Sequence, residues 1–581
     1  MDSYTNSSQS TTHTKDLTDL PNDIFLIISS YLSPQDCVLC RRVSRSWLAA
    51  FSSNDTSWNL MRWHFPRSRE MQTAAEELDE IPDWPSIFPK VARRYYHLRS
   101  AKPWVVEKIS VVQEAPAKGS FRGVAPWSRW LRWNDNTAVF QHRDPTWCVD
   151  DGLLVYQEIV SGRHIAYDLQ TRQRFFVPFD SSKKTVRRLR LVCGVLIIEW
   201  CEREPYHQLN DRETVHRHFA TAFDVRRQRW HASPSSPGAQ FVWNITFRSE
   251  WKIHFLGLPL NNHDRFFSTH TATHYAVYLW QPNRSSWGEE DPLEQLTIWD
   301  ISAPSPYRPS LDPYGAHKPG LDQPGPTVVN RFIWRDLEFL GLRQRHTPAL
   351  REILLDDRNV YVHEEEHRWL AGLHSSLSPP RHHMVRCTGI PFARGACGPR
   401  WADECCADGD VHMSFCPRAG ALRRLLRKKK GSDTTKTTKT QFVDALGELG
   451  MAKERELDDI KGLDPAWPGW APCWRHEEFP YLTVSHVVDA AAGVRVVARQ
   501  CFMMEALSSF VMPKISFEED KGVEDIDDET GAKKEGEEKG GGEVRFADGM
   551  WWELMGKGKI GGDERWIVGE DGAGKVSIVR F

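Results

Sequence analysis

The stretch DLPNDIFLIISSYLSPQDCVLCRRVSRSWLAAFSSNDTSWNLMRWHF, residues 19–65, decides how this chain is read. Its apolar residues recur at helical spacing and predict a bundle of short helices. The first helix carries one apolar stripe, formed by Ile24, Ile27, Ile28, Tyr31 and Leu32. Phe25 and Leu26 lie beside this stripe and widen it.

Capping residues divide the stretch into its helices. Pro21 is expected in the opening turn of the first helix, where its missing N–H costs nothing. Ser33 is expected to cap the second helix by accepting a hydrogen bond from the Asp36 amide, while Asp36 reaches back to the Ser33 N–H. Ser44 is expected to cap a third helix. The apolar positions that continue through these helices are Leu39, Val43, Trp47, Leu48, Phe51, Trp58 and Met61.

This pattern resembles an F-box, as found in proteins of the fungal type with a β-rich C-terminal domain. The matching motifs are Leu20-Pro21 with Ile24, Leu32-Ser33-Pro34 with Asp36, Arg41-Arg42-Val43-Ser44-Arg45 with Trp47, and the later Trp58. The resemblance implies docking onto a Skp-type adaptor, which bridges to a cullin scaffold. The candidate adaptor-binding residues are Leu20, Pro21, Ile24, Ile28, Leu32, Leu39, Val43 and Trp47.

The size of this unit supports a binding role independently. So short a bundle buries little surface, and its surplus of Leu, Ile and Trp needs a partner or a neighbouring domain to cover it. The alternative is a helical cap that packs on the C-terminal part of its own chain. Exposed Ile24, Ile28 and Leu32 would favour the adaptor, and buried ones the cap.

Length and composition place the unit in a large soluble chain. The 581 residues suffice for several domains. The 75 basic and 78 acidic side chains nearly balance, so net charge does not indicate nucleic acid. Residues 1–15 are polar and predict a disordered tail rather than a signal peptide, and the longest apolar run, residues 192–198, is too short to cross a membrane.

The 12 cysteines lack the spacing of a disulfide framework. Without a secretory signal, reduced thiols are the default. We therefore expect a cytoplasmic or nuclear protein.

Residues 66–103 predict a helical linker after the F-box-like unit at 16–65. Short helices are expected at 71–78 and 91–98, separated by a break near Pro82 and Pro85. The run Arg93-Arg94-Tyr95-Tyr96 could be a solvated face or a clamp between domains, and its charge favours the solvated face.

From residue 104 to 581 the period changes to that of strands. Runs rich in Val, Ile, Tyr, Phe and Trp alternate with turn residues, at 153–160, 164–169, 174–179, 188–200, 219–225, 241–247 and 295–301. Several runs end in Asp, whose carboxylate can accept backbone N–H groups two residues on; these are Asp168, Asp224, Asp300 and, weakly, Asp489. The recurrence favours a β-propeller over a two-sheet sandwich or several small β domains.

Three segments interrupt the strands and predict disordered insertions, at 302–326, 427–440 and 516–543. The first is Pro-rich, the second follows a basic cluster at 423–430 that could serve nuclear import, and the third is acidic. The chain then returns to strands, with a last hairpin at 563–568 and 575–581 that would close a circular array.

The segment His363-Glu364-Glu365-Glu366-His367 matches the H-E-x-x-H motif of zinc hydrolases. On a helix the two His side chains would share one face. The preceding Val-Tyr-Val run instead predicts a strand, where residues four apart lie roughly 13 Å from each other. A third ligand at a familiar spacing is also missing, so we interpret the segment as a charged, exposed turn.

The other motifs are weaker. A cluster of possible metal ligands consists of Cys397, Cys405, Cys406, His412 and Cys416. Its residues lack the paired spacing of structural zinc sites, so we interpret them as loop residues. Two glycine patterns, at 556–561 and 569–575, resemble phosphate loops. No βαβ unit surrounds the first, and too few residues follow the second for the helix that would hold phosphate, so both predict turns. The turn Glu570-Asp571-Gly572 suits a hairpin.

The sequence therefore predicts a non-catalytic subunit of a Skp–cullin–F-box ubiquitin ligase. Its helical F-box would dock the adaptor, and its β domain would bind an unknown target protein. We expect no cofactor, metal, nucleic acid or membrane. An F-box scaffold that tethers a partner without degrading it, and a zinc hydrolase using His363, Glu364 and His367, are the alternatives.

Overall fold

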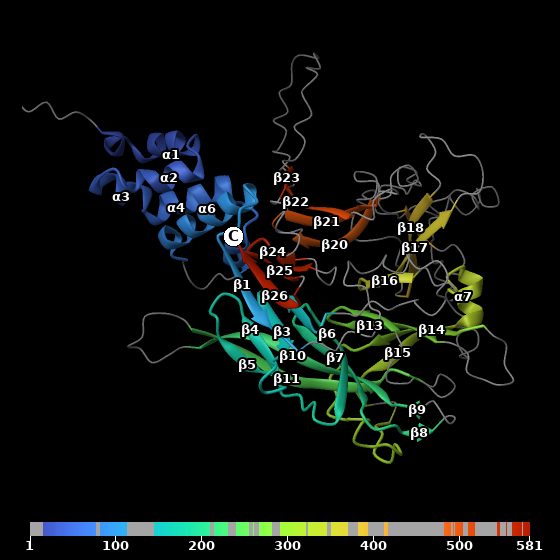
Figure 1. The fold of residues 1–581 in the computed structure, drawn as a ribbon. Coiled ribbons are helices and arrows are strands. Elements are labelled where there is room, and N and C mark those ends of the chain that lie inside the picture. The colour runs from blue at the N-terminus through green and yellow to red at the C-terminus, as the bar shows by residue number, and fades with distance from the viewer. Residues whose placement is uncertain are drawn as a thin grey trace, which may run out of the picture.

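A computed structural model (Figure 1) describes residues 16–76, 82–112, 145–208, 214–230, 240–254, 260, 266–281, 291–320, 323–345, 350–369, 381–392, 412–415, 481–489, 492, 494–502, 509–517, 543–545, 553–554, 560–571 and 573–581. Helices come first and strands follow. The predicted segment 427–440, the basic cluster at 423–430 and most of 516–543 lie outside the described residues, as do Cys397, Cys405, Cys406 and Cys416.

The N-terminal region is helical. After the short 3₁₀ helix η1 (Leu17–Asp19) its elements are α1 (Asn22–Ser30), α2 (Pro34–Cys40), α3 (Arg45–Phe51), α4 (Asn54–His64), α5 (Arg69–Glu76) and α6 (Trp84–Arg99). The expected caps at Ser33 and Ser44 are confirmed, because each hydroxyl accepts the backbone N–H three residues on. Pro21 differs slightly, since it stands at the N-cap of α1 rather than inside its first turn. Asp36 also differs, accepting from the Ser33 hydroxyl.

The rest is strand-rich, and the described strands form six four-stranded sheets and a two-stranded one. In chain order within each sheet they are β1 (Val105–Ser110) with β24 (Ile560–Asp563), β25 (Trp566–Glu570) and β26 (Lys575–Arg580); β2 (Trp147–Asp150), β3 (Leu153–Gln157), β4 (His164–Asp168) and β5 (Arg174–Phe176); β6 (Lys184–Val192), β7 (Val195–Glu202), β10 (His218–Trp230) and β11 (Gln240–Lys252).

The remaining sheets follow the same plan. They are β12 (Phe266–His270), β13 (His274–Gln281), β14 (Leu293–Asp300) and β15 (Thr327–Ile333); β16 (Leu350–Leu355), β17 (Asn359–Trp369), β18 (Arg381–Pro391) and β19 (His412–Phe415); β20 (Tyr481–Asp489), β21 (Val494–Phe502), β22 (Ser509–Phe517) and β23 (Glu543–Arg545); and the small pair β8 (His207–Gln208) and β9 (Thr214–Val215). Helix α7 (Trp334–Leu340) follows β15.

Neighbouring strands pair in chain order, and all these pairs are antiparallel except β18 with β19. The first sheet is the exception in chain order, because the C-terminal β26 pairs with β1, with Val105 opposite Arg580 and Ser110 opposite Lys575. The expected last hairpin, β25 and β26, is therefore present, and it joins the two ends of the strand region.

Sheets that follow one another in the chain share apolar cores. One core joins Trp147 and Tyr156 to Val568 and Ile578 of the first sheet. Successive cores then join the β2–β5 sheet to the β6–β11 sheet, that sheet to β12–β15, and β12–β15 to β16–β17. Edge strands also touch from sheet to sheet, β24 with β2, β2 with β6, β6 with β12, β12 with β16, and β20 with β24. Because both faces of a sheet are covered, β7 is buried along nearly its whole length.

Several strand predictions needed correction. The single run at 188–200 is two strands, β6 and β7, joined at Cys193 and Gly194, whose positive φ angles of 49° and 72° form a tight hairpin turn. Asp168 and Asp300 close turns as predicted, accepting the backbone N–H two residues on. Asp224 does not, because it lies within β10 and accepts from Arg248 instead.

In its described parts, 302–320 and 323–326, the Pro-rich segment is an ordered connection between β14 and β15 rather than a disordered insertion. Ser516 and Phe517, which we placed in the acidic insertion, pair with β21 as the end of β22. The insertion predicted there can thus begin no earlier than residue 518.

Candidate functional site

Helix α1 separates its apolar residues onto two faces. Phe25 and Ser29 are buried, and Phe25 packs edge-on against Phe51 with ring centroids 5.0 Å apart. The predicted stripe points the other way, since Ile24, Ile28 and Tyr31 are 45%, 36% and 86% exposed. The helix therefore uses its minor apolar face for its own core and leaves the larger one in solvent.

The next two helices continue this pattern. Leu39 on α2, Val43 in the turn after it and Leu48 on α3 are all exposed. Helices α1 and α2 contact each other, because the buried Cys37 thiol lies 3.8 Å from the Ser29 carbonyl oxygen. We call the exposed apolar residues of α1 to α3 the head surface, which consists of Ile24, Ile27, Ile28, Tyr31, Leu39, Val43 and Leu48.

The candidate adaptor-binding residues divide into two groups. The exposed ones are Pro21, Ile24, Ile28, Leu39 and Val43. Leu20, Leu32 and Trp47 are half-buried, and the last two pack against the core of the helical region. Trp47 stacks on Phe51 and donates its indole N–H to Asp16 at 3.0 Å, so it holds η1 against α3. The adaptor-binding set did not include Ile27, Tyr31 and Leu48, which belong to the same surface.

The core beneath the head surface is completed by the linker. Phe51, Leu60 and Met61 from the F-box-like stretch are fully buried together with Phe88 and Val91 of α6. Helix α6 starts earlier than predicted, at Trp84, with Pro85 in its first turn and Pro89 inside it. The head surface thus rests on a helix from outside residues 16–65.

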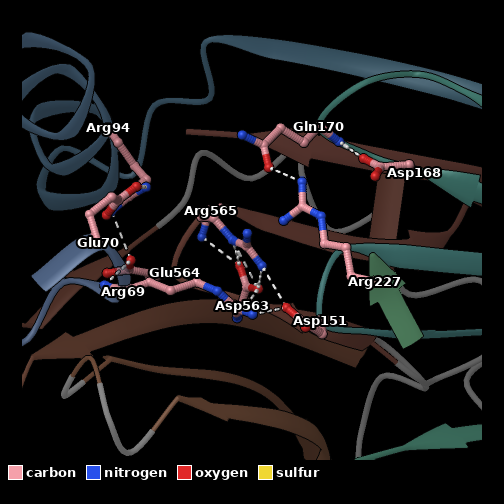
Figure 2. Close-up of polar contacts among 10 residues, drawn as sticks. All are labelled: Arg69, Glu70, Arg94, Asp151, Asp168, Gln170, Arg227, Asp563, Glu564 and Arg565. Atoms are coloured by element: carbon pink, nitrogen blue, oxygen red, sulfur yellow. Dashed lines mark hydrogen bonds and ion pairs between the residues drawn. The ribbon is translucent and has the colours of Figure 1, made fainter. Parts of the chain in front are cut away.

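At its other end α6 contacts the strand region through a buried carboxylate (Figure 2). Glu564, in the turn between β24 and β25, is fully buried. Arg94 donates to it at 2.8 Å, the Tyr95 hydroxyl donates to it as well, and the backbone N–H of Arg69 does so at 3.2 Å. Arg94 also forms two bonds to Glu70 of α5, at 2.9 and 2.7 Å.

Burial and the Arg94 charge together determine the pKa values of the acidic groups in this cluster. Burial raises the pKa of Glu564, although Arg94 and the Tyr95 hydroxyl oppose the shift. Burial also raises the pKa of Tyr95, together with the nearby Glu564 charge, so the hydroxyl remains a donor. For Glu70 burial acts in the same direction, but the bonds from Arg94 outweigh it and lower its pKa.

A second layer of ion pairs surrounds the buried cluster (Figure 2). Arg69 pairs with Asp151 in the β2–β3 turn, and Arg565 pairs with Asp563 at 2.6 Å and Asp151 at 3.4 Å. Farther along, Arg227 of β10 donates to Gln170 at 3.0 Å. These contacts tie the helical region to the first sheet and to the turn of the next one.

The prediction that the run Arg93-Arg94-Tyr95-Tyr96 forms a solvated face is therefore wrong for its two central residues. Arg94 and Tyr95 are buried and form the clamp between the two regions, whereas Arg93 and Tyr96 are exposed. Two adjacent residues are buried between two exposed ones because each helical step turns the chain by about 100°, so only part of the run faces the strands. Its partner Glu564 carries no sequence signal that links it to residues so far away in the chain.

The H-E-x-x-H segment lies on β17, so the predicted strand is confirmed and the exposed turn is wrong. His363 and Glu364 are buried. His363 lies 3.7 Å from Glu352, and Glu364 accepts from Gln344 at 2.8 Å. In the part of the chain that the structure describes, no three His, Cys, Asp or Glu side chains form a group suited to a metal ion.

The described residues of the two glycine patterns lie in strands or in a strand-joining turn, whereas Gly556 and Gly558 lie outside the described residues. Gly561 belongs to β24 and Gly569 to β25, and Gly574 lies in the turn that joins β25 to β26. The predicted hairpin at Asp571 is confirmed, because its carbonyl accepts the Gly574 N–H at 3.0 Å. Among the described residues, no helix has both the length and the apolar character needed to cross a membrane.

Comparison with known families finds one match. Residues 17–61 match the F-box-like family model, which covers η1 to α4 up to Met61. No curated protein matches the chain. An F-box-like domain suggests an adaptor-binding role in a ubiquitin ligase, since F-box domains generally bind Skp-type adaptors. The chain thus has an N-terminal F-box-like region followed by a strand-rich region.

Proposed function

We propose that this chain is a substrate-receptor subunit of a Skp–cullin–F-box ubiquitin ligase, of the fungal type with a β-rich C-terminal domain. The observation that carries the proposal is the head surface. Ile24, Ile28, Leu39 and Val43 are exposed on the F-box-like domain although the domain has a well-filled core beneath them. Exposed apolar groups of this kind mark binding surfaces for other proteins.

The mechanism is positional. The adaptor would hold the F-box-like domain and bridge to a cullin, while the strand region holds a target protein near the conjugating enzyme. Tethering raises the effective concentration of the target's lysines. Ubiquitin chemistry belongs to other subunits, and the chain acts without a catalytic residue, cofactor or metal of its own. We place it in the cytoplasm or nucleus, without a nucleic-acid or membrane partner.

We further infer that the strand region is a β-propeller of six blades. Three features support this: six four-stranded sheets among the described strands, the edge-strand contacts of β20 with β24, β24 with β2, β2 with β6, β6 with β12 and β12 with β16, and the pairing of β26 with β1. Circular closure of this kind protects a series of sheets from exposed edges. A propeller would give the receptor a broad rigid surface for its target.

The adaptor contact is tested by making the head surface polar. Because Ile24 and Ile28 are already exposed, Ile24→Asp with Ile28→Asp should leave the fold intact. We expect adaptor affinity to fall by at least about a hundredfold, since two central apolar anchors are lost. Binding of purified adaptor is measured by titration calorimetry, and the thermal unfolding temperature checks the fold.

Two further variants complete this test. Tyr96→Asp introduces the same charge at an exposed apolar residue of α6, outside the head surface, and should bind adaptor normally. Leu20→Ala with Pro21→Ala should abolish adaptor co-purification while the strand region stays folded. Full adaptor binding by both double variants would contradict the proposal.

The second candidate is an F-box scaffold that tethers a partner without degrading it. The head surface fits both functions equally. Partner half-life decides between them: the ligase shortens it and the scaffold leaves it unchanged when the chain is expressed. The zinc hydrolase loses its support, because His363 and His367 lie on one strand roughly 13 Å apart.

A further inference from the structure

The Pro-rich connection between β14 and β15 is fastened to the edge of a neighbouring sheet. The Ser305 N–H donates to the Arg248 carbonyl oxygen at 3.0 Å, and the Ser310 N–H donates to the Glu250 carboxylate at 3.0 Å. Both acceptors belong to β11, the last strand of its sheet. Arg248 in turn donates to the Ser302 carbonyl at 2.9 Å. The segment thus covers an edge strand, which needs such protection.

Beyond this anchor the segment folds around Asp312. Its carboxylate accepts the backbone N–H of Ala316 at 2.9 Å, that of His317 at 2.7 Å and the Tyr307 hydroxyl at 3.1 Å. This turn leaves Leu311 and Tyr314 77% and 91% exposed. A loop held by so many bonds that presents two large apolar side chains to water has the character of a binding site.

Unpaired positive charge lies beside this loop. Lys184 begins β6 and Lys252 ends β11 at the same end of one sheet. In the described parts of the chain, neither ammonium group has a carboxylate within ion-pair distance. The nearby acids are engaged, because Glu202 pairs with Arg217, and Glu250 accepts from Thr221 and Ser310.

The surroundings of the two lysines favour the binding of an anion. The Lys184 ammonium lies 4.5 Å from the ring centre of Phe179 and 4.6 Å from that of Trp200. Burial lowers the pKa of Lys184 and of Lys252, which means that both ammonium groups have lost hydration. An acidic ligand would restore the interactions that water no longer supplies.

Two more side chains extend this surface, and one of them, Arg308, lies near enough to Lys184 for its charge to lower the pKa of that lysine. Arg308 lies 3.9 Å over the Phe247 ring of β11. Tyr206, 55% exposed, lies 5.2 Å from the Arg217 guanidinium, which also donates to the Ser310 carbonyl at 3.4 Å. We call the resulting set the anchored-loop surface, which consists of Lys184, Tyr206, Lys252, Arg308, Leu311 and Tyr314.

We propose that the anchored-loop surface binds an acidic segment of the target protein, with carboxylates on Lys184, Lys252 and Arg308 and an apolar side chain against Leu311 and Tyr314. This inference rests on the proposed receptor function and specifies the target-binding site. Charge complementarity would provide steering and register, and the apolar contact would provide most of the affinity. An acidic segment without an apolar residue would therefore bind more weakly.

The test selects peptides with the full chain alone, and adaptor binding is measured separately. A library of random twelve-residue peptides displayed on phage is the probe, and the affinity of the enriched peptides is measured by fluorescence anisotropy. We expect enrichment of Asp and Glu together with Leu or an aromatic residue. Affinity should fall as salt is raised, because the ion pairs are partly exposed. Failure to enrich acidic peptides would overturn the proposal.

Matched variants then locate the site. Lys184→Met with Lys252→Met keeps the apolar stems, and Leu311→Ser with Tyr314→Ser changes exposed positions, so both should fold. Each should weaken binding of the enriched peptides at least about tenfold. The control is Ile159→Ser with Val160→Ser, in the β3–β4 turn of another sheet, where Val160 is 94% exposed. Equal binding by all three variants would place the site elsewhere and refute the inference.

Adaptor binding, measured on the same preparations, separates this inference from the proposed function. If adaptor binds and acidic peptides do not, the anchored-loop inference fails and the receptor role stands. If peptides bind and adaptor does not, the receptor role fails.

Discussion

Single buried residues hold the two regions of this protein together, and Glu564 is the central one. It accepts from Arg94, Tyr95 and the Arg69 backbone, and lies in the strand region while two of these donors come from α6. Breaking a buried pair is costly because the remaining charge stays without compensation. The orientation of the helices relative to the strands therefore depends on this carboxylate.

Replacing Glu564 tests that dependence. Glu564→Ala should destabilise the protein by about 3–5 kcal/mol, since Arg94 loses its fully buried carboxylate partner and keeps only the partly exposed Glu70. Denaturant unfolding measures the change. Glu158→Ala is the matched control: its partner Arg174 is 59% exposed, and the loss should be about 1 kcal/mol or less. Equal losses of stability for the two variants would show that the buried cluster contributes no more than an exposed ion pair.

His164 makes stability depend on pH. It is fully buried beside Phe179, and neither ring nitrogen has a hydrogen-bond partner among the described residues. Burial lowers its pKa from 6.5 to about 4. Between pH 6.5 and about 4, His164 therefore binds a proton in the unfolded chain but not in the folded chain. The stability contributed by neutral His164 is present above pH 6.5 and is lost as pH falls toward 4.

His164→Leu should remove this dependence. Between pH 7.5 and 5 the wild type should lose about 2 kcal/mol more stability than the variant. Denaturant unfolding at both pH values gives the comparison. The control is His207→Leu on β8, where the side chain is exposed; it leaves the buried His164 in place and should behave like wild type. A variant with the full pH dependence of the wild type would exclude His164 as its source.

At the scale of elements, α6 supports the head surface from below. Phe88 and Val91 are fully buried, and α6 contacts α2 and α4. Helix α2 carries part of the head surface, and α4 contacts α1, which carries another part. The family match ends at Met61 and so omits part of the core of the domain it describes. Binding by the F-box-like domain should therefore require residues beyond the match.

Phe88→Ala tests the support. We expect a loss of about 3–5 kcal/mol in stability, as for large-to-small changes in a core, and weaker adaptor binding although Phe88 is not on the head surface. Circular dichroism and calorimetry measure the two effects. Lys90→Ala, at an exposed position of the same helix, should change neither. Normal adaptor binding by Phe88→Ala would show that α1 to α4 suffice.

The sequence predicted elements better than their boundaries or contacts. Helix caps at Ser33 and Ser44 followed from local chemistry, as did the turns at Asp168 and Asp300. The division of 188–200 into two strands was missed because Cys193-Gly194 is an unusual turn pair. Asp224 followed the same local rule but was drawn to Arg248, a contact that depends on tertiary structure.

The exposed face of α1 was only half predictable. The stripe of Ile24, Ile27 and Ile28 is visible in the sequence, but periodicity does not say whether such a stripe faces a core or solvent. Its exposure follows from the position of Phe25, which occupies the core in its place. The clamp at Arg94 and Tyr95 was beyond sequence reasoning, because its acceptor is a turn residue at the far end of the chain.

At the scale of the whole molecule, the pairing of β26 with β1 joins the ends of the strand region. Val576 and Ile578 of β26 are fully buried, and they pack on Trp147 and Tyr156 of the next sheet. The first sheet thus combines residues from both ends of the strand region. Its stability should depend on the last residues of the chain more than on most loops.

Removing residues 575–581 should therefore disrupt far more than one strand. Strand β1 loses its pairing partner, β25 loses one of its two, and the core next to Trp147 opens. We expect rapid cleavage throughout the strand region in limited proteolysis. A control lacking residues 1–15, outside the folded part described, should resist proteolysis like the full chain. Resistance of the C-terminal truncation would mean that this pairing is dispensable.

The position of α6 between two buried contacts restricts how the chain can vary. One inserted residue between Phe88 and Arg94 would rotate Arg94 by about 100° around the helix axis and shift it by about 1.5 Å. The guanidinium would then point away from Glu564 while Phe88 stayed in place. The six-residue step from Phe88 to Arg94 therefore cannot change in length without turning the helical region relative to the strand region.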